Sequence, residues 1–281
     1  MADGWRWDAT LFEGAAAHYE RGRLPYAPGY AETLAAALGL DHRSRVLDVG
    51  CGPGTVTLDL APLAGETIGL DPDSGMLAEA RRRAGRRKVP GVRWVLGRAE
   101  DLPGDLGGGF QAVVFAQSFH WTDRDRVAAT VLRMLAPGGA FVQVGDVKSA
   151  PPAVYAEIGD LVRRHLGPVR RAGQGALVNG TPGREDLVLA RAGFGPVERI
   201  VVPAGEVVER TPDDLVAWTF SRSGSAPHLF GDRLAGFEHD LRALLGQGPF
   251  PERLPATEIR LWHSAQHTYT YAHTEEADDA E

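Results

Sequence analysis

Hydrophobic positions along the first half of the chain follow two patterns that replace one another in turn. Short apolar runs of about five residues, the first of them Val46–Val49, predict buried strands. Longer segments of mixed apolar and polar residues predict helices between them, and this alternation favours a parallel sheet with helices on both faces. The predicted strands are Arg45–Val49, Thr67–Asp71, Val92–Leu96, Ala112–Ala116, Ala140–Gly145, Val197–Pro203 and part of Glu258–Tyr271, and the helices are Thr55–Leu63, Asp73–Ala84, Arg124–Leu135 and Arg184–Ala192.

Three segments interrupt this alternation. Residues 1–44 form a helical lead-in, and inserts at about 151–183 and 211–255 follow the fifth and sixth strands. Because the carboxyl ends of parallel strands meet at one edge of a sheet, both inserts should lie over that edge and form a lid with the lead-in. The expected helices are Thr10–Tyr19, Tyr30–Leu38, much of Pro151–Val178, Asp213–Ser221 and Phe230–Leu245.

The sequence therefore predicts an α/β fold with a doubly wound, mostly parallel seven-stranded sheet and helical lid inserts. The main domain should span residues 45–272. The acidic tail at 273–281 is expected to be disordered and solvated.

The charge balance argues against a nucleic-acid partner. The formal net charge is −7, but five acids lie between Glu275 and Glu281, so the rest of the chain sums to about −2. No apolar run reaches the ~18 residues of a transmembrane helix, and the N-terminus lacks a basic region followed by an apolar core. We expect no membrane segment and a cytoplasmic location. The oligomeric state is left open.

The segment VLDVGCGPGT at residues 46–55 carries the strongest functional signal. It predicts a strand, a glycine-rich turn and a helix, and glycines let the backbone of such a turn approach a ligand closely. The dinucleotide fingerprint would need its third glycine at Thr55 rather than Gly54, which disfavours a pyrophosphate site. The one cysteine, Cys51, is interpreted as a small turn residue rather than a reactive thiol.

Three further polar stations follow the next strands. Asp71 ends the second strand, where a carboxylate can hold a ribose diol or, alternatively, cap the following helix. Glu100 and Asp101 follow the third strand, where a carboxylate can accept from an adenine amine or remain in solvent. The fourth strand leads into the segment QSFHW at 117–121, whose aromatic rings could stack on a substrate or fill the core.

In order and spacing, these stations resemble the motifs of the class I S-adenosylmethionine (SAM) methyltransferases that act on small molecules. The resemblance covers about Ala16 to Gly145, roughly half of the chain, and implies a Rossmann-like fold, SAM as cofactor and a small-molecule acceptor. The lead-in AHYERGRLPY at 17–26 is similar to the segment that closes over the cofactor in such enzymes. The other segments that carry the resemblance are VLDVGCGPGT, GLDPDSGML, GRAEDLP, FAQSFHW and VLRMLAPGGAFV.

The resemblance also implies a set of cofactor contacts, position by position. The glycine turn, ordered by Asp48, would cradle the methionine part of SAM, Asp71 would hold the ribose hydroxyls, and an arginine would meet the carboxylate. Tyr19 and Met76 could instead serve packing alone. The contacts so implied are Tyr19, Arg21 or Arg23, Asp48, Gly50, Cys51, Gly52, Gly54, Asp71, Pro72, Met76, Asp101 or in its place Glu100, Leu102 and Gln117.

Methyl transfer requires the protein to position the reactants and exclude water, and a base is needed only if the acceptor must lose a proton early. His120, at the carboxyl end of the fourth strand, is the candidate base, with a buried structural role as the alternative. Phe119 and Trp121 are the candidate substrate contacts. No set of residues suggests a metal site. Two other functions stay open: a SAM-binding protein without methyl transfer, such as a cyclase or binding module, and, less favoured, an NAD-dependent oxidoreductase.

Overall fold

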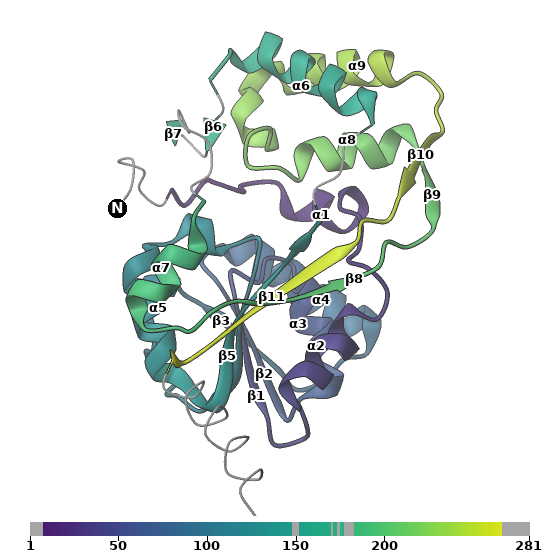
Figure 1. Cartoon of the computed structure of the whole chain (residues 1–281). Helices are drawn as coiled ribbons and strands as arrows, with labels where there is room; N and C mark the ends of the chain where they lie inside the picture. The colour runs from purple at the N-terminus through teal and green to yellow at the C-terminus, as the bar shows by residue number, and fades with distance from the viewer. Residues whose placement is uncertain (1–7, 148–151, 170, 173–174, 177–182, 266–281) are drawn as a thin grey trace, which may run out of the picture.

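The structure, a computed structural model, describes residues 8–147, 152–169, 171–172, 175–176 and 183–265 (Figure 1). Its centre is a seven-stranded sheet with the strand order β3-β2-β1-β4-β5-β11-β8. Strand β11 runs antiparallel to β5 and β8, and the other neighbouring pairs are parallel, which confirms the predicted fold class. The strands are β1 (Arg45–Val49), β2 (Glu66–Asp71), β3 (Val92–Leu96), β4 (Phe110–Ala116), β5 (Leu135–Asp146), β8 (Glu198–Val202) and β11 (Thr257–His263).

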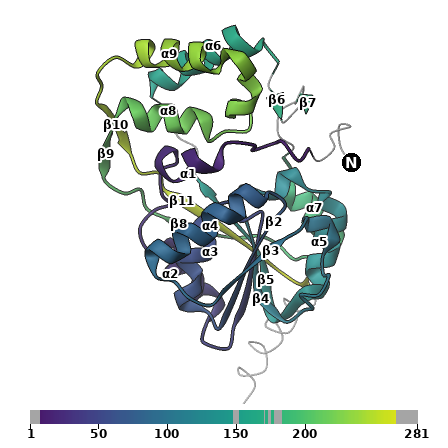
Figure 2. The ribbon, with the colours of Figure 1, turned by 180° about the vertical axis from the view of Figure 1, so that it is seen from behind.

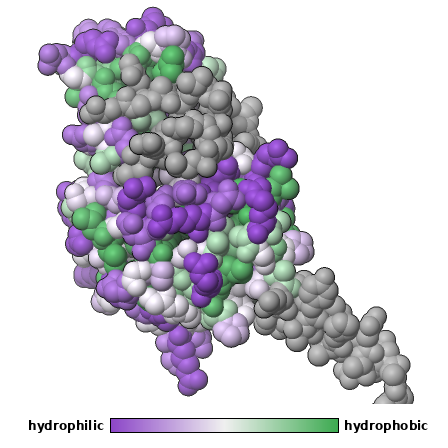
Figure 3. Space-filling model, turned by 90° about the vertical axis from the view of Figure 1, so that its left-hand side faces the viewer, coloured by the Kyte–Doolittle hydropathy of each residue, from purple (hydrophilic) through white to green (hydrophobic). Residues whose placement is uncertain are grey.

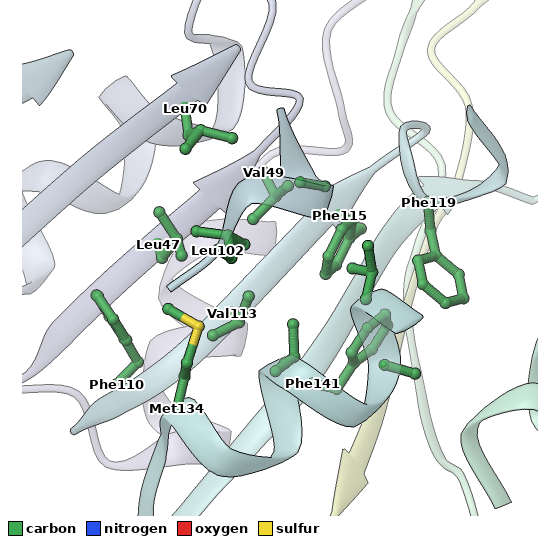
Figure 4. Packing of buried hydrophobic residues seen from close by; sticks show 14 of the residues in the cluster. Leu47, Val49, Leu70, Leu102, Phe110, Val113, Phe115, Phe119, Met134 and Phe141 are labelled. Atoms are coloured by element: carbon green, nitrogen blue, oxygen red, sulfur yellow. The ribbon is translucent and has the colours of Figure 1, made fainter. Parts of the chain in front are cut away.

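The central strands carry a different core on each face because side chains alternate along a strand. Leu47 of β1, Phe115 of β4 and Phe141 of β5 belong to the core on one face (Figure 4). Their neighbours Val46 and Val114 belong to the core on the other face. Both faces are thus covered, which explains why these strands consist of nearly continuous apolar runs in the sequence.

Helices cover both faces of the sheet, as predicted. α2 (Tyr30–Leu38) and α3 (Thr55–Leu60) pack on the face of Val46, and α5 (Arg124–Met134) and α7 (Glu185–Ala192) pack on the opposite face. α4 (Ser74–Arg87) packs along β2 and β3. The N-cap of α4 is Asp73, whose carboxylate accepts the N–H groups of Gly75 and Met76 at 2.7 and 3.1 Å.

A second group of helices, here called the helical subdomain, lies apart from the sheet, beyond one end of its strands (Figures 1 and 2). It consists of α6 (Ala153–Leu166), α8 (Pro212–Phe220), the 3-10 segment η5 (Pro227–Arg233) and α9 (Leu234–Leu245). Its own core includes the rings of Phe230 and Phe237, which stack at 4.0 Å. The subdomain therefore has an apolar interior separate from the two cores of the sheet.

The lead-in helix α1 (Ala16–Gly22) lies between the helical subdomain and the sheet (Figure 1). It crosses α8 so closely that a Cβ on Gly22 would lie 2.4 Å from the backbone of Ala217. The buried Arg210 donates to the carbonyl oxygens of Gly22 and Asp214 at 2.8 and 3.0 Å. α1 is thereby held to the helical subdomain at its carboxyl end.

Two helix predictions are wrong in their extent, both because of glycine. The lead-in helix begins at Ala16 rather than Thr10, since Gly14 adopts φ +79° just before it. α6 ends at Leu166, where Gly167 with φ +86° is followed by a proline. The expected helix up to Val178 is replaced in its described part by two short paired strands, β6 (Arg171–Ala172) and β7 (Gly175–Ala176).

A second antiparallel strand pair was also not predicted. β9 (Val207–Arg210) lies just before the second insert and β10 (Phe250–Arg253) lies near its end. The two strands pair with each other, so the paired residues lie far apart in the sequence. No short-range pattern could have paired them. The part of the last predicted strand beyond residue 265 and the acidic tail lie outside the described residues. The proposed domain limits stay predictions.

The face of the molecule in Figure 3 mixes hydrophilic side chains with smaller hydrophobic groups. Among the helices that the structure describes, none is both long and apolar enough to cross a membrane.

The close approach of α1 to α8 predicts opposite effects of two glycine substitutions. Gly22→Ala should lower the free energy of unfolding by about 1–3 kcal/mol, because the added Cβ would overlap backbone atoms of α8. Gly85→Ala in the exposed part of α4 meets nothing within 4 Å and should raise it by about 0.5–1 kcal/mol. Urea denaturation of both variants measures the difference, and equal shifts would contradict the tight crossing.

Candidate cofactor site

A pocket opens where β1, β2 and β4 end, and it encloses about 720 Å³ of space, part of it open to solvent. The residues predicted from the sequence that line it are Tyr19, Gly50, Gly52, Asp71, Pro72, Met76, Glu100, Gln117 and Trp121. The lining residues that were not predicted are Phe12, Val49, Leu70, Asp73, Arg98, Ala99, Ala116, Ser118 and Thr122. Residues from separate motifs of the sequence therefore meet in one cavity.

The glycine turn forms one wall of the pocket through Gly50 and Gly52, which adopt φ +68° and +54°. A Cβ on Gly50 would lie 2.5 Å from Cβ of Ser118, whereas a Cβ on Gly52 would meet nothing within 4 Å. The amides of Gly50 and Cys51 both donate to the Leu70 carbonyl oxygen. These glycines therefore supply space and an unusual backbone path rather than a row of free N–H groups.

The third glycine of the turn faces away from the pocket. Gly54, with φ +76°, would place a Cβ 2.5 Å from the Trp94 ring and 3.3 Å from Ala80. It is needed because β3 and α4 pack against the turn from behind. Cys51 is buried, burial raises the pKa of its thiol, and it does not line the pocket. The cofactor roles of Gly54 and Cys51 stay predictions.

Asp71 joins the glycine turn to the start of α4. Its two carboxylate oxygens accept the N–H groups of Gly52 and Asp73, each at 2.8 Å. Burial raises its pKa to about 6. Each carboxylate oxygen keeps a second acceptor position, so the group can hold the turn and still receive hydroxyl donors. The alternative role of Asp71 as the cap of α4 belongs instead to Asp73.

Asp48 lies behind the pocket wall and is completely buried. One carboxylate oxygen accepts from the Thr57 hydroxyl at 2.6 Å, while no donor in the described part of the chain reaches the other. Burial, together with the smaller effect of the nearby charge of Asp71, raises the pKa of Asp48 to about 7. The carboxylate thus ties β1 to α3, next to the turn.

At the third station, the predicted residue that lines the pocket is Glu100, not Asp101 or Leu102. Glu100, in the 3-10 turn Ala99–Asp101, accepts the backbone N–H of Asp123 at 2.8 Å and pairs with Arg98 at 3.3 Å. Asp101 is exposed, Leu102 is buried in the core, and neither lines the pocket.

At the fourth station, Gln117 lines the pocket with a backbone φ of +60°, a conformation that non-glycine residues rarely adopt. Its side-chain nitrogen lies 2.8 Å from where a Cβ on Gly145 would be, so the glycine in β5 makes room for it. Phe119 is 2% exposed and packs against the rings of Phe115 and Phe141, inside the core shown in Figure 4.

Of the two residues after Phe119, only Trp121 lines the pocket. Trp121 lines it and meets the ring of Phe12 edge-on at 6.4 Å. His120 does not line it, but its ring lies 4.7 Å from that of Trp121, between centroids. His120 therefore borders the site through Trp121.

The lead-in contributes Phe12 and Tyr19 to the pocket. Arg23, the predicted partner of a carboxylate, stacks over the Tyr19 ring at 5.0 Å and donates to the hydroxyl and carbonyl oxygens of Ser221 at 2.9 and 3.0 Å. Arg21 pairs at the surface with Asp214 at 2.7 Å. Neither arginine lines the pocket, and both hold α1 to α8.

Most of the unexpected lining residues adjoin a predicted motif, so a broader view of each motif would have included them. Ser118 and Thr122 flank the predicted aromatic residues, and Arg98 and Ala99 precede Glu100. Phe12 carried no such signal, because it reaches the site from a turn that precedes α1. Within the described residues, no group of three or more His, Cys, Asp or Glu side chains could hold a metal ion.

The chain matches known proteins over the same region. A family model described as a methyltransferase domain matches residues 46–139. An uncharacterised methyltransferase of Mycobacterium tuberculosis is 34% identical over 166 residues, which cover 59% of this chain and 64% of that protein. Trans-aconitate 2-methyltransferase of Methylobacterium nodulans is 36% identical over 130 residues, or 43% of this chain and 46% of that one. The matched region thus spans less than two thirds of either relative.

A solved structure resembles the whole fold. It belongs to a proposed type II methyltransferase from Anaeromyxobacter dehalogenans, is 26% identical, and covers 86% of this chain and 97% of that chain with a TM-score of 0.50. The sequence and structure matches converge on one group of proteins, and they do not favour the NAD-dependent alternative.

The two buried acids predict a stability that falls as the pH rises. Asp48 and Asp71 have folded-state pKa values of about 7 and 6, above their ordinary value of 3.8, so the folded chain binds protons more tightly than the unfolded chain. The free energy of unfolding without ligand should decrease between about pH 4 and pH 7, by on the order of 4 kcal/mol for Asp48.

Thermal unfolding of wild type and Asp48→Asn across this range measures the effect, and the variant should show the flatter profile. Asp232→Asn is the matched control, because Asp232 is exposed. A profile of Asp48→Asn as steep as that of the control would contradict the assignment.

Proposed function

We propose that this chain, which belongs to the class I SAM-dependent methyltransferase superfamily, binds SAM in the pocket at the sheet edge and moves its methyl group to a small organic acceptor. The observation that carries the proposal is the buried Asp71 carboxylate, which faces the pocket between the glycine turn and α4. Family membership rests on the matched methyltransferase domain and the related methyltransferases.

The pocket lining fits the parts of SAM. Pro72 and Met76 provide an apolar wall suited to an adenine ring, with the carboxylate of Glu100 nearby. Asp71 has acceptor positions left for a ribose diol, and Gln117 offers an amide at the opposite wall. When bound, SAM supplies a methyl group that its sulfonium makes electrophilic.

We infer that the acceptor is a small molecule held under the helical subdomain. α1 and α8 are joined by close packing and ion pairs, and Phe12 and Tyr19 of the lead-in already form part of the pocket wall. Such a cover would exclude water and long polymers from the reacting centre. One relative's name gives a small organic acid as acceptor, which supports this class without identifying the acceptor of this chain. Methylation of an oxygen, a nitrogen or a carbon atom of the acceptor would each fit the proposal. A cytoplasmic location stays a prediction.

In this proposal, His120 removes a proton from the acceptor when the reaction requires it. Its ring lies 4.7 Å from that of Trp121, which lines the pocket, so an acceptor bound against Trp121 would have to extend beside this ring to reach the imidazole. A SAM-binding protein without methyl transfer would use the same lining, so only turnover separates the two functions.

Calorimetric titration with SAM, and separately with NAD, tests the cofactor. We expect micromolar binding of SAM, and its loss in Asp71→Ala, because that variant lacks both the ribose acceptor and the anchor of the turn. Asp73→Ala is the control, since it removes the α4 cap but keeps the Asp71 carboxylate, and it should weaken binding less. Tighter binding of NAD, or no binding of SAM, would overturn the proposal.

His120→Ala should lower kcat by about 100-fold or more while changing the Kd for SAM little, because a general base acts in the reaction and not in cofactor binding. Methyl uptake from labelled SAM, screened over phenols, amines and carboxylic acids, supplies the assay. An unchanged kcat would remove His120 from the mechanism.

A further inference from the structure

A buried arginine lies directly behind the proposed cofactor pocket. Arg83 of α4 is only 7% exposed. One guanidinium nitrogen donates to the Pro53 carbonyl oxygen at 2.9 Å and to the Thr55 hydroxyl at 3.0 Å. Another donates to the Glu20 carboxylate at 3.2 Å. One side chain therefore contacts both the glycine turn and the lead-in helix α1.

Two contacts of Arg83 adjoin residues that line the pocket. Pro53 follows Gly52 in the turn, and Glu20 follows Tyr19 on α1. Arg83 itself lies on α4, whose first turn carries Met76. Arg83 does not line the pocket, but it thus connects three segments that do.

Glu20 is the acid that compensates this buried charge. Burial lowers the pKa of the Arg83 guanidinium, Glu20 opposes that effect, and arginine stays charged in proteins. Glu20 also pairs with Arg86, which contacts the buried Glu79 at 3.4 Å. The neighbouring Arg87 is neutralised by Asp59 at 2.7 Å. Glu20 is therefore the point at which α1 joins the charge network of α4.

We propose that Arg83 is a positioning residue whose pair with Glu20 holds α1 over the pocket, so that the retention of SAM depends on this pair. The inference rests on the proposed function. α1 is held at one side to α8 by Arg21 and Arg210, and at the other side to α4 by the Glu20 pair. Without the pair, α1 would stay attached to the helical subdomain, and its link to the sheet domain would rest on the Glu20–Arg86 pair and on the apolar packing around Met76.

The test compares two substitutions that remove the same charge from the lead-in. Glu20→Gln breaks the pair while Arg83 keeps its bonds to the turn, and Glu20 is half exposed, so the fold should tolerate the change. Glu13→Gln is the control, because its exposed side chain lies outside this network. The dissociation rate of labelled SAM, chased with excess unlabelled SAM, is measured on the full chain, together with the melting temperature without ligand.

We expect Glu20→Gln to release SAM about tenfold faster, with little change in melting temperature, and Glu13→Gln to match the wild type. Arg83→Lys keeps the charge but cannot span both partners, so it should also release SAM faster. The double variant Glu20→Gln/Arg83→Lys should raise the dissociation rate by less than the product of the two single effects, because both changes break the same pair.

Equal dissociation rates for Glu20→Gln and Glu13→Gln would overturn the inference. A faster release of SAM from Glu20→Gln together with a clearly lower melting temperature would also overturn it, because the substitution would then have loosened the fold as a whole. Failure of the wild-type chain to bind SAM would instead overturn the proposed function, together with this inference, and it would be seen before any substitution is made.

Discussion

The bonds of the Asp71 carboxylate to two backbone amides are the constraint on which the site depends. They join the end of β2 to the glycine turn after β1 and to the start of α4, three segments that meet only at this edge of the sheet. The carboxylate is buried, so its bonds are shielded from water and the turn is held in a conformation that favours glycine. The same residue lines the pocket. One side chain therefore holds the turn in place and, in the proposed function, would also contact the ligand.

One part of the pocket belongs to the sheet domain, and another part belongs to the lead-in, which packs on the helical subdomain. Its floor consists of strand ends and the glycine turn, packed on the cores of the sheet. Its cover comes from the lead-in, which packs more closely on α8 than on any strand. The buried Arg83 connects the two parts through its bonds to Glu20 and to the Pro53 carbonyl oxygen. This division fits a site that must hold a cofactor firmly and still exchange it.

The sequence predicted the sheet and the glycine turn well because both depend on local patterns. Continuous apolar runs identified each central strand, and the Asp71 position followed from the end of one such run. Contacts between distant segments were harder to anticipate. Gly54 belongs to the motif, yet the reason for it is the Trp94 ring on β3. Phe119 lies in the segment with Trp121, but the strand end turns its ring into the core.

The sequence by itself determined the fold class, the seven strands and the four stations at which polar residues follow them, because periodicity and glycine spacing are properties of short segments. Only the tertiary structure decided which members of each station reach the pocket, that Arg23 bonds to Ser221, and that Phe12 joins the site. Those outcomes depend on how helices from distant parts of the chain pack at the sheet edge. Packing is a property of shapes that meet in space, and no local pattern records it.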